Sequence, residues 1–311
     1  NTKKNTTMPL TLLDIAKRSG SDEVVGLIEE VLTVAPEFRT IPVRPITGTS
    51  YKATFRTGLP GSGFRGANEG VTPGNSVYDQ KSVDCYFLDC QMQVDEAIVK
   101  ADEGRIGDIL TDEGIAALQS SFITVGKQVY DGISADSKGF TGLFANVDSS
   151  MVVNAEGSGT ATHTAWAIYE NETNGVHFPL GNGGALELGE WLRQQVKDAN
   201  NKSFMAWVNN LSAWLGLNLT TKYSIGCVKN ITSAKPLTDA LGNELVSKFP
   251  VGRKPTHWFM SRDAKFYLQC SRSATLGQKD RGRGDAFAAI PTALADVPIV
   301  ETDSIAPRAA A

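Results

Sequence analysis

The sequence has few cysteines and histidines, which limits the chemistry available to it. Among 311 residues there are 4 cysteines and 3 histidines. The cysteines lack the CxxC spacing of zinc sites, and their scatter gives no disulfide framework. The histidines lie far apart and share no metal-ligand spacing. We therefore predict reduced thiols and no metal-binding residues.

Long apolar runs are also missing. No stretch approaches the roughly 18 residues that cross a bilayer. The start, from Asn1 to Met8, is polar and contains no apolar signal core. We expect neither a membrane-spanning segment nor a secretory leader, and no membrane partner.

Charge is nearly balanced along the chain. The formal net charge is −4, and basic residues do not form a block. Binding of nucleic acid by phosphate neutralisation requires a clustered cationic surface. We predict no such binding, although a weakly acidic wall is compatible with a container that encloses nucleic acid.

No catalytic constellation can be assembled from the sequence. No serine or cysteine stands in a nucleophile elbow, and HExxH is absent. Gly61 to Gly66 matches GxGxxG, but a dinucleotide site needs those glycines to begin a helix. Gly70, Pro73 and Gly74 follow, and they do not fit a helix. We predict a loop tip here, and no catalytic or cofactor-binding residues.

The sequence does contain an unusually long polar segment between two strands. Ser50–Thr57 and Ser82–Val94 alternate as strands do, and residues 58–81 between them are rich in Gly, Pro, Asn and Ser. Connections of this length without structure of their own are uncommon and usually functional. We predict a two-stranded arm that reaches away from the body and needs a surface to lie on.

Helices are predicted from apolar periodicity. Two short amphipathic helices are expected at Leu10–Arg18 and Asp22–Ala35. A long helix is expected at Thr111–Tyr130, with Thr111 as N-cap and acidic residues in the first turn. Its apolar side consists of Ile115, Leu118, Phe122, Val125 and Val129.

The remaining segments make the chain α+β. Asp198–Lys202 has turn chemistry, so we predict a hairpin of Glu190–Val196 and Phe204–Leu219 in preference to a helix over Leu186–Val196. The other predicted elements are strands at Trp166–Glu170, Thr256–Met260 and Ile299–Asp303, helices at Pro236–Phe249 and Asp263–Cys270, and a flexible loop at Ser271–Asp285.

The order and spacing of the segments carry a family resemblance. The stretches concerned are Leu10–Lys17, Tyr51–Asp95, Thr111–Tyr130, Gly139–Leu143, Trp207–Leu219, Cys227–Ile231, Phe259–Asp263, Leu268–Arg272 and Val297–Ile305. In this order they resemble the major capsid proteins of tailed bacteriophages with the HK97-type fold, in the branch with a short N-terminal arm. The tail from Ala306 to Ala311 departs from the acidic strand end of that pattern.

The resemblance implies a domain division. It comprises an N-terminal arm over 1–47, an extended β-hairpin loop over 48–81, a peripheral domain over 82–146 and 291–311, and an axial domain over 147–290. Thr111–Tyr130 becomes the spine helix of the peripheral domain.

The resemblance also implies a function. The chain is expected to be a structural protein, not an enzyme, whose copies form pentamers and hexamers of an icosahedral or prolate head around double-stranded DNA. Expected partners are a scaffolding protein, a portal and, as a further candidate, a decoration protein, with assembly in the bacterial cytoplasm and residence in the virion. Cofactors and a covalent crosslink are not expected. Residues expected to contact neighbouring subunits are Tyr51, Lys52, Phe55, Arg56, Phe64, Arg65, Glu69, Tyr78, Leu12 and Leu13.

The sequence also allows two other functions. An encapsulin-like shell subunit shares the fold but encloses cargo enzymes instead of a genome. A soluble enzyme using Gly61 to Gly66 for phosphate is the alternative of another class.

Overall fold

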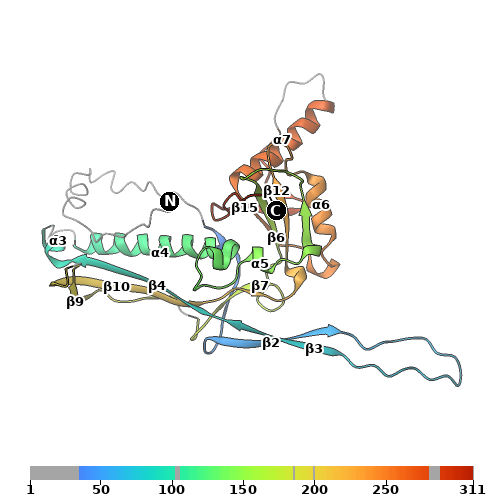
Figure 1. Cartoon of the computed structure of the whole chain (residues 1–311), viewed down its shortest axis with the longest axis horizontal. Helices are drawn as coiled ribbons and strands as arrows, with labels where there is room; N and C mark the ends of the chain where they lie inside the picture. Colours follow the sequence, from blue (N-terminus) through green and yellow to red (C-terminus); the bar gives the residue numbers. More distant parts are fainter. Residues whose placement is uncertain (1–34, 102–105, 185, 199, 280–287, 311) are drawn as a thin grey trace.

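The structure has three parts that differ in shape. The computed structural model describes residues 35–101, 106–184, 186–198, 200–279 and 288–310. Figure 1 shows a long, flat part in which helix α4 lies along a sheet, a second part in which helices pack on another sheet, and a two-stranded arm that projects from the body. No helix within the described ranges is long and apolar enough to span a membrane.

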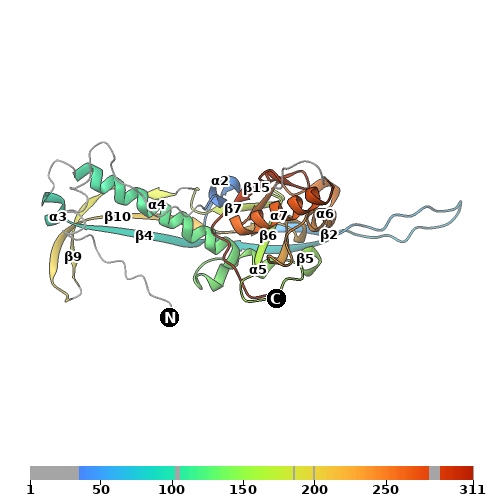
Figure 2. The same cartoon turned by 90° about the horizontal axis from the view of Figure 1, so that it is seen from above.

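The flat part is built around one long strand. β10 (Ser203–Leu215) pairs antiparallel with β4 (Tyr86–Asp95) and, at its start, with β9 (Leu192–Lys197). Helix α4 (Ile106–Asp131) lies along β4 and β10 in both views (Figures 1 and 2). The same sheet contains β1 (Val43–Pro45), β7 (Val176–Leu180), β8 (Glu187–Leu188) and β11 (Asn218–Leu219), and α3 (Glu96–Ala101) follows β4.

Helix α4 packs on this sheet through one small and one larger side chain. Ala117 lies in a buried cluster with Met92 of β4 and Leu211 of β10, and the partly buried Leu118 packs against this cluster. Gly114 and Ser121 are also buried, but a Cβ added at Gly114 would have no atom within 4 Å.

The second part is a mixed sheet covered on both faces. Its strand order is β14-β15-β13-β6-β12-β5. Along β6, Trp166 enters one core cluster and its neighbour Ala167 enters another, since successive strand residues point to opposite faces. Leu245 of α6 and Leu268 of α7 belong to the second cluster, so both helices cover the same face. The strands are β5 (Val152–Asn154), β6 (His163–Ile168), β12 (Ile225–Ile231), β13 (His257–Met260), β14 (Ala293–Leu294) and β15 (Val297–Glu301), and the helices are α6 (Asp239–Ser247) and α7 (Arg262–Lys279).

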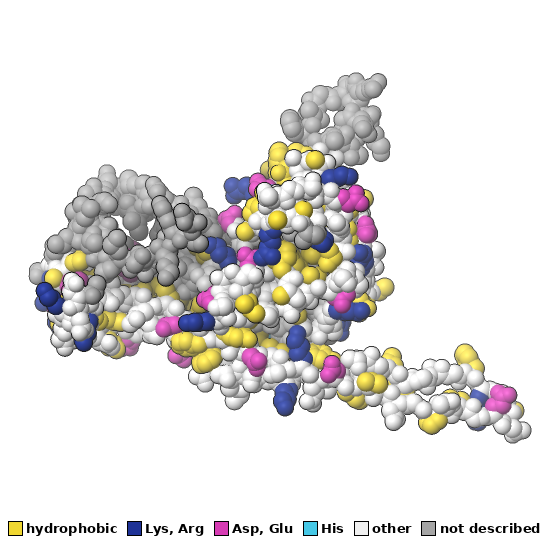
Figure 3. All heavy atoms as spheres, in the orientation of Figure 1, with side chains coloured by type: hydrophobic (Ala, Val, Ile, Leu, Met, Phe, Trp, Pro, Cys, Tyr) yellow, Lys and Arg dark blue, Asp and Glu magenta, His cyan; other side chains and the backbone are white. Residues whose placement is uncertain are grey.

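The third part, the hairpin arm, consists of β2 (Ser50–Gly58), β3 (Val77–Asp84) and the connection of residues 59–76. Its strands pair antiparallel from Ser50↔Asp84 outward, with a register shift between Arg56 and Gly58. One residue, Cys85, separates β3 from β4, so the arm continues the direction of the flat part (Figure 2). Figure 3 shows the arm standing clear of the body, with apolar side chains along it.

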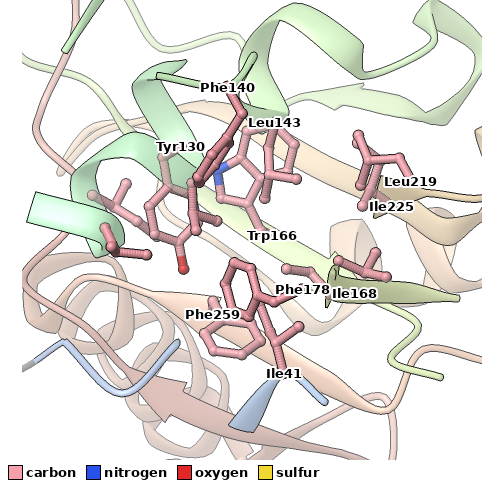
Figure 4. Close-up of a cluster of buried hydrophobic side chains, with 14 of the residues drawn as sticks. Ile41, Tyr130, Phe140, Leu143, Trp166, Ile168, Phe178, Leu219, Ile225 and Phe259 are labelled. Carbon is pink, nitrogen blue, oxygen red and sulfur yellow. The ribbon is translucent and has the colours of Figure 1, made fainter. Parts of the chain in front are cut away.

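The largest core lies where the two sheets and the end of α4 meet. Tyr130 of α4, Trp166 of β6, Phe178 of β7 and Phe259 of β13 are fully buried and converge there (Figure 4). Because these rings come from both parts of the body, they fix the long helix to the second sheet. Two short helices, α2 (Glu37–Thr40) and α5 (Leu143–Asn146), also contact α4.

Several predicted elements are confirmed with shifted bounds. The hairpin around residues 198–202 is β9 and β10, and Asp198 Oδ1 accepts the backbone N–H groups of Asn200 (2.9 Å) and Lys202 (2.7 Å). The predicted strands near Trp166, Thr256 and Ile299 are β6, β13 and β15. The predicted helices at Leu10–Arg18 and Asp22–Ala35 lie outside the described residues.

The long helix differs from the prediction at its start. It begins at Ile106, so Thr111 is not an N-cap; its hydroxyl donates to the carbonyl of Gly107 (2.8 Å) inside the helix. The predicted apolar side is buried only in its second half. Ile115 is 55% exposed and Phe122 is 36% exposed, whereas Ala117 and the partly buried Leu118 pack against the sheet.

Two other predictions were wrong in part. α7 continues to Lys279, so the first half of the predicted loop Ser271–Asp285 is helical. Arg272 stabilises it by donating to the Asp239 carboxylate (2.9 and 2.6 Å) and to the Ala293 carbonyl (2.9 Å). The predicted strand Ser82–Val94 is divided at Cys85, where the chain passes from the arm to the flat part.

The predicted domain division does not follow the strand pairing. Residues 187–215, predicted as axial, pair with one another and with β4 beside α4. Residues 293–301, predicted as peripheral, pair with β13 in the second sheet. Sequence order hides both facts because each segment pairs with strands distant in the chain.

Candidate assembly surfaces

The two faces of the hairpin arm differ in their surroundings. Directly paired residues of an antiparallel hairpin share a face, and successive residues alternate between faces. One face, partly buried toward the body, contains Tyr51, Ala53, Phe55 and Val83, and the opposite, exposed face contains Lys52, Thr54, Arg56, Tyr78 and Gln80.

Side chains of the exposed face contact one another. Arg56 Nη2 donates to the Tyr78 hydroxyl (3.4 Å), and its guanidinium lies 5.5 Å from the centre of the Tyr78 ring. Lys52 is exposed on the same face nearer the root, with the Thr54–Gln80 pair between it and Arg56. This contact orients the Arg56 guanidinium and the Tyr78 ring, and both side chains remain exposed to solvent.

The tip of the arm presents apolar side chains to solvent. Phe64 is fully exposed and Leu59 is 76% exposed. The backbone around them is ordered by polar contacts: Arg65 Nη1 donates to the Glu69 carbonyl (2.9 Å), and the Gly66 N–H donates to Glu69 Oε2 (3.1 Å). Gly61 to Gly66 begins no helix, as predicted.

At the root, the arm is tied to its own body. The Tyr51 hydroxyl lies 3.0 Å from His177 Nε2, and Asn218 Nδ2 donates to the same hydroxyl (2.7 Å). Of the residues predicted to contact neighbours, Tyr51 therefore has partners within the subunit. Leu12 and Leu13 lie outside the described residues.

An open groove separates the arm from the body beyond this root. Its volume is about 380 Å³. Phe55 lies on the arm side, and Val147, Leu219 and Ile225 lie on the body side. Each side also contributes charged groups, Asp79 and Lys81 on the arm, Asp148 and Lys222 on the body.

Sequence reasoning missed His177 and Asn218. They are 126 and 167 residues from Tyr51, and neither stands in a catalytic or metal-binding motif. No local pattern could have found them, because β7 and β11 bring them together only in the folded chain.

A buried carboxylate lies where α2, α4 and the C-terminal segment meet. Glu37 is 1% exposed and accepts hydrogen bonds from the hydroxyls of Thr302 and Ser304. Burial raises the pKa of Glu37, and the hydroxyl contacts only partly oppose this shift. The pKa of the buried Tyr130 hydroxyl is also raised, first by burial and then by the Glu37 charge.

We expect Glu37→Gln to become increasingly favourable relative to the unaltered chain as the pH rises. With a raised pKa, Glu37 contributes stability that is full below its ordinary pKa of 4.5 and is lost as the pH rises through the raised value. Unfolding in denaturant at a series of pH values between about 4.5 and about 8 tests this. Glu187→Gln, at an exposed position, is the matched control for the loss of one charge. A stability difference that does not change with pH for Glu37→Gln would contradict the assignment.

No group of His, Cys, Asp and Glu in the described ranges is arranged to hold a metal ion. The Cys227 thiol is buried, and burial raises its pKa to about 12, so it is unreactive at neutral pH.

Comparison with known proteins gives the family. The model of the family described as major capsid protein GP7 matches residues 28–308. The chain belongs to this family. As a major capsid protein it is a structural component of a virion shell, and the resemblance inferred from segment order is confirmed.

Solved structures give the fold of this capsid protein. The bacteriophage epsilon15 structure matches with a TM-score of 0.70 at 15% identity, over 98% of each chain. The capsid of bacteriophage JBD30 matches with a TM-score of 0.52 at 11% identity, over 89% of this chain and 93% of that one. The chain therefore has the HK97-type capsid fold, as predicted. Among curated proteins, sequence comparison gives no significant match.

The encapsulin alternative receives little support. An encapsulin complex from Synechococcus elongatus matches with a TM-score of 0.44 at 12% identity, over 71% of this chain and 96% of that one, which is too weak to carry an argument. The matching family is that of a major capsid protein, which is a structural component of a shell.

Proposed function

We propose that this capsid protein forms rings of five and six copies that close into the icosahedral or prolate head of a tailed bacteriophage. The observation that carries the proposal is the hairpin arm. A two-stranded ribbon is marginally stable alone, yet this one stands clear of the described body, and Phe64 near its tip is fully exposed. Such a ribbon is stabilised when it lies on a second copy of the chain.

The contacts we assign to neighbouring subunits are on the exposed face and tip of the arm. Heterologous contacts of this kind generate rings or open arrays, depending on the rotation between copies. Tyr51 contacts the body of its own subunit, and Phe55 faces the groove between the arm and the body. The proposed contact residues are Lys52, Arg56, Phe64, Arg65, Glu69 and Tyr78.

The strand pairing supports a revised domain division. We assign residues 86–131 and 187–215 to the peripheral domain, since they form α4 and the strands beside it. Residues 149–168 and 222–301 form the axial domain around the second sheet. The core at the end of α4 joins the two domains.

Further partners follow from the role of a head subunit. The shell encloses double-stranded DNA without reading its sequence, in keeping with a net charge of −4. A scaffolding protein, a portal and a decoration protein are the proposed partners, and assembly takes place in the bacterial cytoplasm before the subunit becomes part of the virion.

Assembly of purified protein tests the proposal. We expect sedimentation velocity to show rings or shells, and negative-stain images to show closed particles. Many modest contacts per subunit make such particles long-lived, since linked contacts exceed single affinities by roughly 10² to 10⁴. Only discrete monomers or dimers, with and without a scaffolding protein, would argue against the proposal.

A further inference from the structure

One arginine makes several different contacts where helix α4 ends. The Arg308 guanidinium donates to the carboxylate of Asp131, the last residue of α4, and its carbon Cζ lies 3.7 Å from the centre of the Phe144 ring in α5. The Arg308 N–H donates to the Thr162 carbonyl (2.9 Å). The Arg308 carbonyl accepts the Thr162 N–H (2.6 Å) and the Thr162 hydroxyl (3.0 Å). Arg308 therefore joins segments that lie 146 to 177 residues before it.

The side chains that receive the guanidinium are anchored in the largest core. The Phe144 ring packs against this core and meets the fully buried Trp166 ring edge to face, with 4.9 Å between their centres. Asp131 directly follows the fully buried Tyr130, whose ring centre lies 6.4 Å from that of Trp166. Figure 4 shows Tyr130 and Trp166 side by side. The carboxylate and the ring are thus positioned by residues other than Arg308.

This pair of contacts suits a guanidinium better than an ammonium group. A planar guanidinium can lie over an aromatic ring and, at the same time, donate its N–H groups to a carboxylate. The ammonium of lysine is a compact charge on a flexible stem and has no plane to stack. Because Arg308 uses the Phe144 ring and the Asp131 carboxylate together, the arrangement selects arginine.

Little else holds the segment that contains Arg308. Ile305 is 3% exposed and belongs to the largest core, but Ala306, Pro307 and Ala309 are exposed. The N–H of the exposed Ala310 adds one hydrogen bond, to the Gly159 carbonyl (2.9 Å). Residues 306–310 are here called the strap. Since the strap buries no apolar side chain, its attachment depends on the contacts of Arg308.

The contacts of Arg308 cross the boundary between the two parts of the body. Asp131 ends α4 beside the flat part, whereas Thr162 directly precedes β6 in the second sheet. Helix α5, which carries Phe144, lies near both (Figure 1). The strap also belongs to the segment that departs from the acidic strand end of the family pattern, so the resemblance does not imply this contact.

We propose that Asp131, Phe144 and Thr162 form an arginine-binding site whose occupant is Arg308, and that this occupant closes the strap over the joint between α4 and the second sheet. With the strap closed, the end of α4 and the start of β6 resist local opening together. With the strap open, each opens separately while both sheets remain folded. The site acts within one subunit and does not depend on contacts between copies.

Hydrogen exchange followed by mass spectrometry tests the site. The unaltered chain is compared with Arg308→Ala and Arg308→Lys, all in the same assembly state as judged by sedimentation. In Arg308→Ala, exchange in segments 125–132 and 160–166 should become faster by roughly tenfold or more, because a charged hydrogen bond and a cation–π contact are lost. Helix α6 packs on the opposite face of the second sheet and should exchange at an unchanged rate.

Arg308→Lys keeps the positive charge without the planar guanidinium, so its two joint segments should exchange nearly as fast as those of Arg308→Ala. Arg253→Ala is the matched control, because Arg253 is also half-buried but donates to the Thr221 hydroxyl (2.6 Å) instead. Unchanged exchange at the joint in Arg308→Ala, or full protection in Arg308→Lys, would overturn the proposal. Equal acceleration in α6, or the same effect in Arg253→Ala, would also overturn it, since either would show a general loss of stability.

Discussion

Replacing residues 59–76 by an Asn-Gly turn is expected to leave a folded subunit that no longer forms stable shells. Gly58 and Val77 are paired at the end of the strands, and Asn-Gly is the preferred two-residue connection for such a pair. The body should unfold at an unchanged denaturant concentration, since the described connection packs on none of its core clusters. The fraction in shells, measured by sedimentation, should fall by roughly 100-fold, the lower end of what linked contacts contribute.

Two single substitutions distinguish the effect of the side chains at the arm tip from the effect of the length of the arm. Phe64 and Val251 are both fully exposed apolar residues, one at the arm tip and one after α6. Phe64→Ser should lower the fraction in shells, whereas Val251→Ser should lower it much less. Normal shells from the arm-shortened chain, or equal effects of the two serine substitutions, would show that the tip does not carry the contact.

Gly132→Ala is expected to destabilise the subunit more than any surface change, by roughly 3 to 5 kcal/mol, from left-handed backbone strain together with overpacking. Gly132 follows α4 with a φ of +55°, and a Cβ there would lie 2.0 Å from the Gly142 nitrogen. Backbone cannot move aside as a flexible side chain does. The free energy of unfolding in denaturant is the measurement.

Gly107→Ala is the matched control for this change. Gly107 lies in the first turn of α4, and no atom lies within 4 Å of its added Cβ, leaving aside the backbone of the helix itself. Alanine favours a helix over glycine by up to about 1 kcal/mol. If both substitutions lowered the free energy of unfolding equally, the close approach of Gly132 to Gly142 would not be the cause of the loss.

The arm and the long helix could be predicted because each has a local signal. Residues 58–81 have little apolar content, and Ile115 to Val129 repeat with helical spacing. Periodicity did not reveal which side of α4 faces the sheet. Ala117 packs there against Met92 and Leu211, although hydrophobicity alone ranks Ile115 and Phe122 above it.

The contacts of Tyr51 with His177 and Asn218, and the strand pairing, could not be predicted for a different reason. Both depend on which distant segments lie side by side, and no local pattern records this. Arg272 illustrates the same limit, since a glycine-rich polar segment remains helical through contacts with Asp239 and Ala293. Long-range partners decide such positions, whatever the local propensity.

The continuity of β3 with β4 gives the subunit a mechanical role. From Val77 to Asp95 the chain runs nearly straight for roughly 60 Å, at about 3.3 Å per residue. A force on the arm along this line acts through the covalent backbone of β3 and β4. It loads in shear the hydrogen bonds between β4 and β10, which pair from Ala206↔Asp95 to Leu215↔Tyr86. Ladder hydrogen bonds loaded in shear resist together, whereas peeling breaks them one at a time. With the arm on a neighbouring copy, as proposed above, tension applied to the arm would pass along this line to the far end of the subunit's own sheet.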